Sequence, residues 1–451
     1  MKKILTIIIE SKSREFDSRM MIAHEAIKRG YQVIIGSQGQ IFKLLKYLPK
    51  CIVFDKCIST FKHEILKKIR RFGHKIVSLD EEGICSDNRK WLYLKHRISG
   101  ENLELIEYFF TWGVNESKLI DSHYPQYKHK IKISGNPRID TWKSDNEGLY
   151  KHETNHIKKK YKDYILINSN FGIFHAIGND FLKNQAFDTN IIETKDEEEK
   201  FDADIEFNKK VFLSFVEMIK FLATSVPDQT ILIRPHPSES IERWKEKFKE
   251  YNNVFIEYKF SVTPWIIASK CMIHSSCTTG IEGFLINRPT ISYLPYKDNN
   301  FVNFVSNKLS DISQNPKQVL EKINSILNQD YNLSEDRKEK IKKVKNILQN
   351  IDNTSATNII LNNIDKIELP VQKKLNDLIF KFAHLENILR KNIKNIISFK
   401  KNQKSFEQQK MPGLSIDEVN SKMKYFEDKN EQLQKLTFKV KKISENLFHI
   451  Y

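Results

Sequence analysis

The strongest constraint on the fold is an alternation of apolar segments with segments of helical spacing, which the chain runs through twice. In the first half the apolar runs lie at residues 4–9, 31–37, 51–54, 74–80, 107–113 and 131–137. The alternation restarts at 164–172 and continues at 230–237, 253–258, 271–276 and 290–295. Strands separated by helices predict parallel, helix-covered sheets. We therefore predict an α/β protein with two doubly wound, Rossmann-like domains facing a cleft. Ligands in such sheets bind beyond the carboxyl ends of the strands.

This pattern divides the 451-residue chain into a first domain at 1–145, a second at 146–365 and a basic helical extension at 366–451. A charged insertion at 193–206 is expected to be an exposed loop or a helix end. In the extension, residues 373–399 and 430–448 show helical spacing, and Ser415 with Glu418 predicts a capping box. Two interpretations stay open for these helices. Packing on the domains or on a second copy is favoured over peripheral attachment to an anionic membrane.

Composition narrows the class of protein. The chain is 40% hydrophobic and 29% charged, which is typical of a soluble globular protein. Its net charge of +17 favours an anionic partner, and the last 86 residues hold 18 Lys and Arg against 10 Asp and Glu. Five scattered cysteines argue against a disulfide framework or a zinc site. The chain also lacks an apolar run of about 18 residues, so we expect a cytoplasmic protein without a membrane span.

Three short segments follow strand ends, where a site is expected. The first, SLDEEGIC, places Asp80, Glu81 and Glu82 before Gly83. Adjacent carboxylates repel one another, which raises the pKa of at least one and suits it to act as a base. A solvated acidic turn is the simpler interpretation of this segment taken alone.

The second segment, ILIRPHPSES, ends a strand with Arg234, Pro235, His236 and Pro237. Each proline fixes its own φ and disfavours helix in the residue before it, so the backbone at His236 is stiff on both sides. A histidine can donate a proton near neutral pH, and an arginine can contact phosphate oxygens with two N–H groups. An ordinary loop histidine is about as well supported by this segment alone.

The third segment, MIHSSCTTGIEGF, ends its strand at His274. Four hydroxyls (Ser275, Ser276, Thr278, Thr279) and Gly280 follow, and a helix is predicted from about Ile281. Small hydroxyls with free backbone N–H groups favour an anion, and Glu282 could accept from ribose hydroxyls. A simple helix cap needs one such hydroxyl. Together the three segments fit group transfer from an activated nucleotide donor.

These motifs resemble those of known enzymes. EEG (81–83), HP (236–237) and SS (275–276) are similar to motifs of bacterial GT-B transferases that use CMP-activated acids, the sialyltransferases and Kdo transferases. The ordered segments SREFDSRMMIA, DEEG, FFTWG, SGNPRID, ILINSNFG, RPHP, HSSCTTGIE and KMPGLSIDEV resemble bacterial surface carbohydrate (capsule and lipopolysaccharide) biosynthesis proteins. The resemblance covers the chain to about residue 420.

The resemblance implies a metal-independent glycosyltransferase that moves a nonulosonic acid or Kdo from a CMP-sugar to a glycan or lipid-linked acceptor. Glu81 or Glu82 would match the base, and His236 would assist departure of CMP. Because the motif reads Asp-Glu-Glu-Gly, any of Asp80, Glu81 and Glu82 could be the base, and Glu81 is favoured. Ser275 and Ser276 would match the phosphate-binding hydroxyls. From their positions after strand ends, we further expect donor binding by Arg234, Pro237, His274, Thr278, Thr279, Gly280, Glu282 and Asn170. On the same ground we expect Arg14, Glu15 and Asp80 on the acceptor side, with Asn136 and Arg138 as further candidates. No cofactor besides the donor substrate is implied, and contact with the cytoplasmic face of the inner membrane stays open.

Three other functions stay open. A CDP-glycerol or CDP-ribitol phosphotransferase of teichoic-type polymers shares the HP and serine motifs. A UDP-sugar 2-epimerase has the same fold. A non-enzymatic nucleic-acid-binding protein is the remote third, since the charge suggests it but no RNA- or DNA-binding module is found and the basic excess lies in the tail.

Overall fold

The computed structural model describes residues 3–83, 90–172, 192–297, 304–333, 336–370, 375, 379–380, 410–429 and 437–451. The chain forms two compact units. Unit 1 comprises Met1–Gly83, Tyr93–Thr141 and Asn346–Tyr451, and unit 2 comprises Ile84–Leu92 and Trp142–Lys345. The chain thus returns to unit 1 at Asn346, earlier than the domain boundary at 365 that the sequence pattern placed.

Unit 1 is built on an eight-stranded sheet in the order β13-β14-β2-β1-β3-β4-β5-β6. Its parallel strands are β1 (Ile4–Ile9), β2 (Gln32–Ser37), β3 (Ile52–Asp55), β4 (Lys75–Leu79), β5 (Tyr108–Thr111) and β6 (Ile131–Ile133). The chain leaves β1 towards β2 on one side and reaches β3 on the other. The point where the strand order reverses, which is the usual ligand position, therefore lies between β1 and β3.

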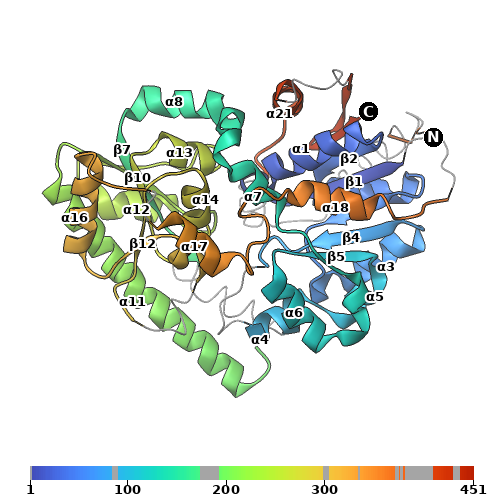
Figure 1. The fold of residues 1–451 in the computed structure, drawn as a ribbon, viewed down its shortest axis with the longest axis horizontal. Helices are drawn as coiled ribbons and strands as arrows, with labels where there is room; N and C mark the ends of the chain where they lie inside the picture. The colour runs from blue at the N-terminus through green and yellow to red at the C-terminus, as the bar shows by residue number, and fades with distance from the viewer. Residues whose placement is uncertain are drawn as a thin grey trace, which may run out of the picture. The chain divides into compact units, whose positions relative to one another are not determined.

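Helices cover both faces of this sheet, which is why its strands are buried on both sides. Helix α1 (Lys12–Lys28) packs with α18 (Ala356–Ile364), and α3 (His63–Arg71) packs with α5 (Gly100–Leu105) (Figure 1). The remaining helices of the unit are α2 (Gln38–Leu44), α6 (Val114–His123), α7 (Pro137–Trp142) and α21 (Ile416–Asp428). Ser415 and Glu418 form the predicted capping box at the start of α21.

Unit 2 has a parallel six-stranded sheet in the order β12-β11-β10-β7-β8-β9. Its strands are β7 (Tyr164–Asn168), β8 (Thr230–Arg234), β9 (Val254–Ile256), β10 (Cys271–His274), β11 (Thr290–Tyr293) and β12 (Asp311–Ser313). The α-helices that the structure describes in this unit are α4 (Lys90–Leu92), α8 (Lys151–Tyr161), α11 (Lys195–Ser225), α12 (Ile241–Phe248), α13 (Thr263–Ala268), α14 (Thr279–Leu285), α16 (Pro316–Leu327) and α17 (Arg337–Val344). The order reverses between β7 and β10. Two parallel, doubly wound units confirm the predicted fold class.

The charged insertion forms the start of a helix, which agrees with the second of the two expected forms, a helix end, and not with a loop. Residues 195–206 belong to α11, the long helix labelled in Figure 1. Thr194 and Glu197 form a capping box at its start, and Lys200 pairs with Asp196 one turn away. No glycine or proline interrupts the segment before Ser225. A polar helix of this kind is stabilised by its cap and its i,i+4 pairs rather than by burial.

The predicted helix at 430–448 is wrong where the structure describes it, from residue 437 on. Strands β13 (Val440–Ser444) and β14 (Leu447–Ile450) form a hairpin there. The turn uses Asn446 at a φ of +56°, a conformation that asparagine tolerates better than most residues. All four residues of β14 are buried, because it pairs antiparallel with β2 at the edge of the parallel sheet. The other predicted helix of the extension, 373–399, lies almost wholly outside the described residues.

Candidate functional site

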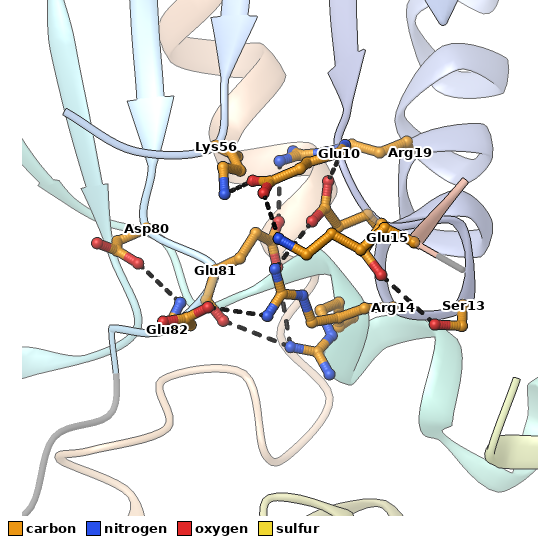
Figure 2. A network of polar contacts seen from close by, with 12 residues as sticks. Glu10, Ser13, Arg14, Glu15, Arg19, Lys56, Asp80, Glu81 and Glu82 are labelled. Atoms are coloured by element: carbon orange, nitrogen blue, oxygen red, sulfur yellow. Dashed lines mark hydrogen bonds and ion pairs between the residues drawn. The ribbon is translucent and has the colours of Figure 1, made fainter. Parts of the chain in front are cut away.

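The carboxyl ends of β1, β3 and β4 bring a polar cluster together in unit 1 (Figure 2). Glu10 follows β1, Lys56 follows β3, and Asp80 follows β4. Figure 2 shows Lys56 facing Glu10, with which it forms an ion pair, at the point where the strand order reverses. Parallel strands end at one edge of a sheet, so residues at least 24 positions apart in the sequence become neighbours here. We call these three side chains and the charged residues joined to them the strand-end cluster. The joined residues are Arg14, Glu15, Arg19, Glu81, Glu82, Arg97 and Lys410.

Glu81, the favoured base, lies inside the protein. Its side chain is only 2% exposed, and its Oε1 lies 2.9 Å from Nη2 of Arg19, which is fully buried. Oε2 lies 3.9 Å from Arg138 and accepts from Asn136 at 3.4 Å. Arg19 in turn stacks on the ring of Phe54. The carboxylate is thus held by two arginines and an amide, as expected of a buried charge that must be paired.

Glu82 is the carboxylate of the three that reaches solvent, with 53% of its side chain exposed. Its oxygens lie 3.0 Å from Arg14 and 3.2 Å from Arg97. Burial of the carboxyl raises its pKa, but Arg97, Arg14 and Lys56 outweigh that effect and hold the pKa at about 2. Glu82 is therefore ionised at neutral pH and is a weak base until a ligand displaces one of its cations.

Asp80 and Glu15 face inward and fix the arginines. Asp80 accepts from two nitrogens of Arg97 and from the backbone N–H of Glu82 at 2.7 Å. Glu15 is fully buried, accepts from the backbone N–H of Glu10 at 2.8 Å and lies 3.3 Å from Arg14. Burial raises the pKa of Glu15. These two predicted acceptor-side residues hold the cluster together, whereas Arg14 remains at its half-exposed rim.

Gly83 closes the turn because no side chain fits there. A Cβ on Gly83 would lie 2.7 Å from the ring of Trp112 and 2.8 Å from Glu116. The Trp112 indole donates to the carbonyl of Asp80 at 2.7 Å, and its backbone N–H donates to Glu116. The glycine therefore lets the acidic turn lie flat on a tryptophan from the end of β5.

Unit 2 places His236 at the carboxyl end of β8, with its backbone N–H donating to the hydroxyl of Ser169 after β7. The ring Nδ1 lies 2.7 Å from the hydroxyl of Ser238 and accepts from the Ser238 backbone N–H at 3.3 Å. A backbone N–H can only donate, so Nδ1 is an acceptor and Nε2 carries the proton in the neutral ring. A Cβ on Gly172 would lie 2.0 Å from the Ser238 hydroxyl, which explains the glycine there.

Glu239 organises these loops, although the sequence patterns did not single it out. Its buried carboxylate accepts from the Ser169 hydroxyl at 2.5 Å, the Phe171 backbone N–H at 2.5 Å and the Trp244 indole at 2.7 Å. Burial raises the pKa of this carboxyl. The signal was present in the sequence as an acid two residues beyond the HP pair, where one side chain can contact both loops.

Three of the predicted donor-binding residues point into unit 2 instead of towards solvent. Arg234 donates to the carbonyls of Lys259 and Phe260, and burial lowers its pKa to about 10. Glu282 is 3% exposed and accepts from the Thr263 hydroxyl at 3.0 Å. Both side chains are engaged in contacts inside unit 2. Either one would have to give up these contacts before it could touch a ligand.

His274 is likewise a buried support. Burial lowers its pKa to about 3, so the ring is neutral. Nδ1 accepts from the backbone N–H of Cys277, and Nε2 lies 2.8 Å from the Ser310 hydroxyl. Gly280 packs against this ring, since a Cβ there would lie 2.4 Å from Nε2.

The remaining predicted donor residues reach the surface at the same sheet edge. Asn170 is exposed, while Pro237, Ser276, Thr278 and Thr279 are half-buried and Ser275 is nearly covered. Ser276 adopts a φ of +50° and accepts from the Asn307 amide at 3.0 Å. Because β10, β7 and β8 are neighbours, the structure does bring the HP and SS motifs to one edge.

The sequence patterns missed several cluster members of unit 1. Glu10, Lys56 and Arg97 lie outside the quoted motifs. Arg19 and Lys410 lie inside the segments SREFDSRMMIA and KMPGLSIDEV, but neither was chosen as a site residue. Lys410 donates to Glu10 at 3.0 Å. For Glu10 and Lys56 a signal existed, because each is a charged residue that comes directly after a strand. Arg19, Arg97 and Lys410 come from helices or distant segments, which only the fold places.

The described residues contain no helix long and apolar enough to cross a membrane. No family model matches the chain, and neither does any curated protein. Several solved structures are similar to the chain. A putative UDP-N-acetylglucosamine 2-epimerase from Listeria monocytogenes aligns with a TM-score of 0.51 at 12% identity, over 83% of this chain and all of that one.

Two further solved structures are similar at lower scores. A UDP-GlcNAc 2-epimerase from Neisseria meningitidis, bound to UDP-GlcNAc, has a TM-score of 0.49 and 14% identity over 81% of this chain and all of its own. The wall teichoic acid polymerase TagF has a TM-score of 0.45 and 12% identity over 82% of this chain and 90% of its own. The likeness to the Listeria protein confirms the GT-B fold. The sialyltransferase and Kdo-transferase part of the resemblance stays a prediction.

Proposed function

We propose that this chain is an enzyme acting on a nucleotide-activated sugar or polyol in surface-glycan assembly, and that it transfers the activated group to an acceptor. The observation that carries the proposal is the pair of contacts that Ser238 makes with Nδ1 of His236. Because Nδ1 accepts from the Ser238 backbone N–H, Nε2 carries the proton of the neutral ring, and this N–H would donate to an oxygen of the leaving phosphate. A donor placed where charge develops stabilises the transition state.

Polar side chains at the same sheet edge support a phosphate beside His236. The amide of Asn170 and the hydroxyl-bearing residues Ser276 and Thr278 lie there and keep part of their surface exposed. Glu239 binds the loop of Ser169 and Phe171 and also contacts Trp244, which limits loop movement. A rigid, polar edge of this kind holds its donors in position before a phosphate binds. Arg234 is not needed for these contacts, because it donates to the carbonyls of Lys259 and Phe260.

Unit 1 supports transfer to an acceptor, since it holds a second strand-end site of its own. Within the acidic turn we propose Glu82 as the substrate-facing carboxylate and Glu81 as a positioning residue, because Glu81 is 2% exposed and Glu82 is 53% exposed. Binding of an anionic group to Arg14 or Arg97 would weaken their hold on Glu82. Its pKa would then rise towards that of a usable base.

Among donors, the motif resemblance favours a CMP-activated sugar acid. A specific observation favours a second candidate, UDP-sugar 2-epimerisation, because the solved structure that shares the fold at a TM-score of 0.51 carries that name. CDP-glycerol or CDP-ribitol transfer is the third candidate, since the HP and serine motifs are common to those enzymes.

The test is a binding and turnover panel on the purified full chain. CMP, CDP, UDP and GDP are titrated first, and the matching activated donors are then incubated with and without acceptor mixtures. Acceptor-dependent release of the nucleotide supports transfer. Release of a 2-epimer from UDP-GlcNAc without acceptor supports the epimerase instead. Absence of binding to all four nucleotides contradicts both.

A further inference from the structure

The C-terminal segment reaches the strand-end cluster of unit 1. Lys410 donates to Oε1 of Glu10 at 3.0 Å, and Lys56 pairs with the other oxygen of the same carboxylate. Lys12 fixes the segment just beyond by donating to the carbonyl of Gly413 at 2.7 Å and to Glu418 at 2.5 Å. Residue 410 is thus tied to a site formed by residues about 400 positions earlier.

The charges of the cluster are sorted by depth. Three carboxylates, Glu15, Asp80 and Glu81, have side chains with at most 2% exposure. Four of the cations lie further out, with side-chain exposures of 28% for Arg14, 25% for Arg97, 33% for Lys410 and 11% for Lys56, whereas Arg19 is fully buried against Glu81. The carboxylates that reach solvent beside them are Glu10 and Glu82.

We call the partly exposed groups the rim of the cluster. The rim carries four positive groups and two negative ones, although the positive and negative charges of the whole cluster nearly balance. Buried carboxylates act on a ligand only through the arginines that cover them, whereas rim cations can contact it directly. We propose that this rim, including Lys410, binds an acidic group, a carboxylate or a phosphate, on the substrate that unit 1 takes. The inference rests on the proposed function only in treating the strand-end cluster as a substrate site.

This proposal gives the C-terminal segment a role in specificity. Lys410 contributes one of the rim cations, and the contacts of Lys12 with Gly413 and Glu418 hold its segment in place. A neutral acceptor would leave the rim cations without a ligand charge and would gain no charge-assisted hydrogen bond. An acidic acceptor would replace part of the pairing that Glu10 and Glu82 now provide.

The experiment compares acidic and neutral probes by saturation-transfer NMR and calorimetry on the full chain. Sialyllactose and lactose test a carboxylate, and mannose 6-phosphate and mannose test a phosphate. We expect at least one acidic probe to bind about tenfold more tightly than its neutral partner. Its affinity should fall as salt is added, since partly exposed charges are screened.

The variants are Lys410→Ala, Lys410→Arg and, as a matched control on the same segment, Lys424→Ala at an exposed position of α21. Lys410→Ala should weaken the acidic probe about fivefold and leave the neutral probe unchanged. Lys410→Arg should retain most of the affinity, and Lys424→Ala all of it. Equal binding of acidic and neutral probes, or an unchanged acidic affinity in Lys410→Ala, would overturn the proposal.

CMP, CDP and UDP affinities separate this proposal from the proposed function. Lys410→Ala should leave nucleotide affinity unchanged, because the nucleotide is assigned to unit 2. A fivefold loss of CMP affinity in this variant would mean that the rim takes the nucleotide's own phosphate, and the acceptor proposal would fail. If wild-type protein binds acidic probes selectively but no nucleotide, the proposed function fails while the proposal that the rim binds an acidic group stands.

Discussion

Oε1 of Glu81 and Nη2 of Arg19 lie 2.9 Å apart, and neither side chain has more than 2% of its surface exposed. A buried ion pair of this kind supports the position of its neighbours and contributes little chemistry of its own. Removing one partner leaves an uncompensated charge in the interior. The acidic turn therefore contains carboxylates with different roles, although they are adjacent in the sequence.

We expect Glu81→Ala to lower the free energy of unfolding by about 3–5 kcal/mol, since Arg19 would keep its buried charge without a partner. Glu82→Gln should change the same quantity by less than about 1 kcal/mol, because the side chain is exposed. Urea denaturation followed by circular dichroism measures both. Equal stability of the two variants would contradict the division of roles.

His236→Ala should reduce nucleotide-dependent turnover by about 10²–10⁴-fold, the usual contribution of a positioned acid. The unfolding free energy should change by no more than about 0.5 kcal/mol, since the ring is half-buried at a loop. Ser238→Ala removes the hydroxyl that fixes the ring and should cause a smaller loss of kcat. Full turnover by His236→Ala would refute the assignment.

Glu116 should make stability depend on pH. Burial raises the pKa of its carboxyl to about 8, although Tyr93 and the Trp112 backbone N–H act in the opposite direction. A folded-state pKa above the unfolded value of 4.5 means that its contribution is complete below about pH 4.5. That contribution is lost as pH rises through about 8.

Glu116→Gln should therefore flatten the stability profile between these pH values. Thermal unfolding midpoints from pH 5 to 9 measure the slope in both proteins. An identical slope in wild type and variant would contradict the prediction.

The C-terminal hairpin depends on a glycine in β2. A Cβ on Gly36 would lie 2.3 Å from the carbonyl oxygen of Asn446, so Gly36→Ala should weaken or displace β14. Gly39→Ala is the matched control, because nothing lies within 4 Å of its added Cβ. We expect faster amide hydrogen exchange at residues 447–450 in the first variant alone. Unchanged exchange in Gly36→Ala would show that the sheet edge adapts.

Local pattern was sufficient for the parallel part of the fold. Buried strands such as β1 and β7 read as continuous apolar runs, and helix ends such as Gly30 and the Ser415 cap carry their own signals. The hairpin β13–β14 escaped prediction because its charged residues mimic a helical face. Its strand pairing is decided by β2, which lies 400 residues away.

For the site, the sequence by itself located the loops that follow the strands, because strand ends and rigid prolines are local features. It could not decide which side chains face outward. Glu81 and Glu82 are adjacent, yet the packing of Arg19, Phe54 and Arg138 buries one and leaves the other exposed. His236 was predictable from its two prolines. Its proton position and the approach of Lys410 to Glu10 were decided by tertiary contacts, since each depends on groups that no local pattern brings together.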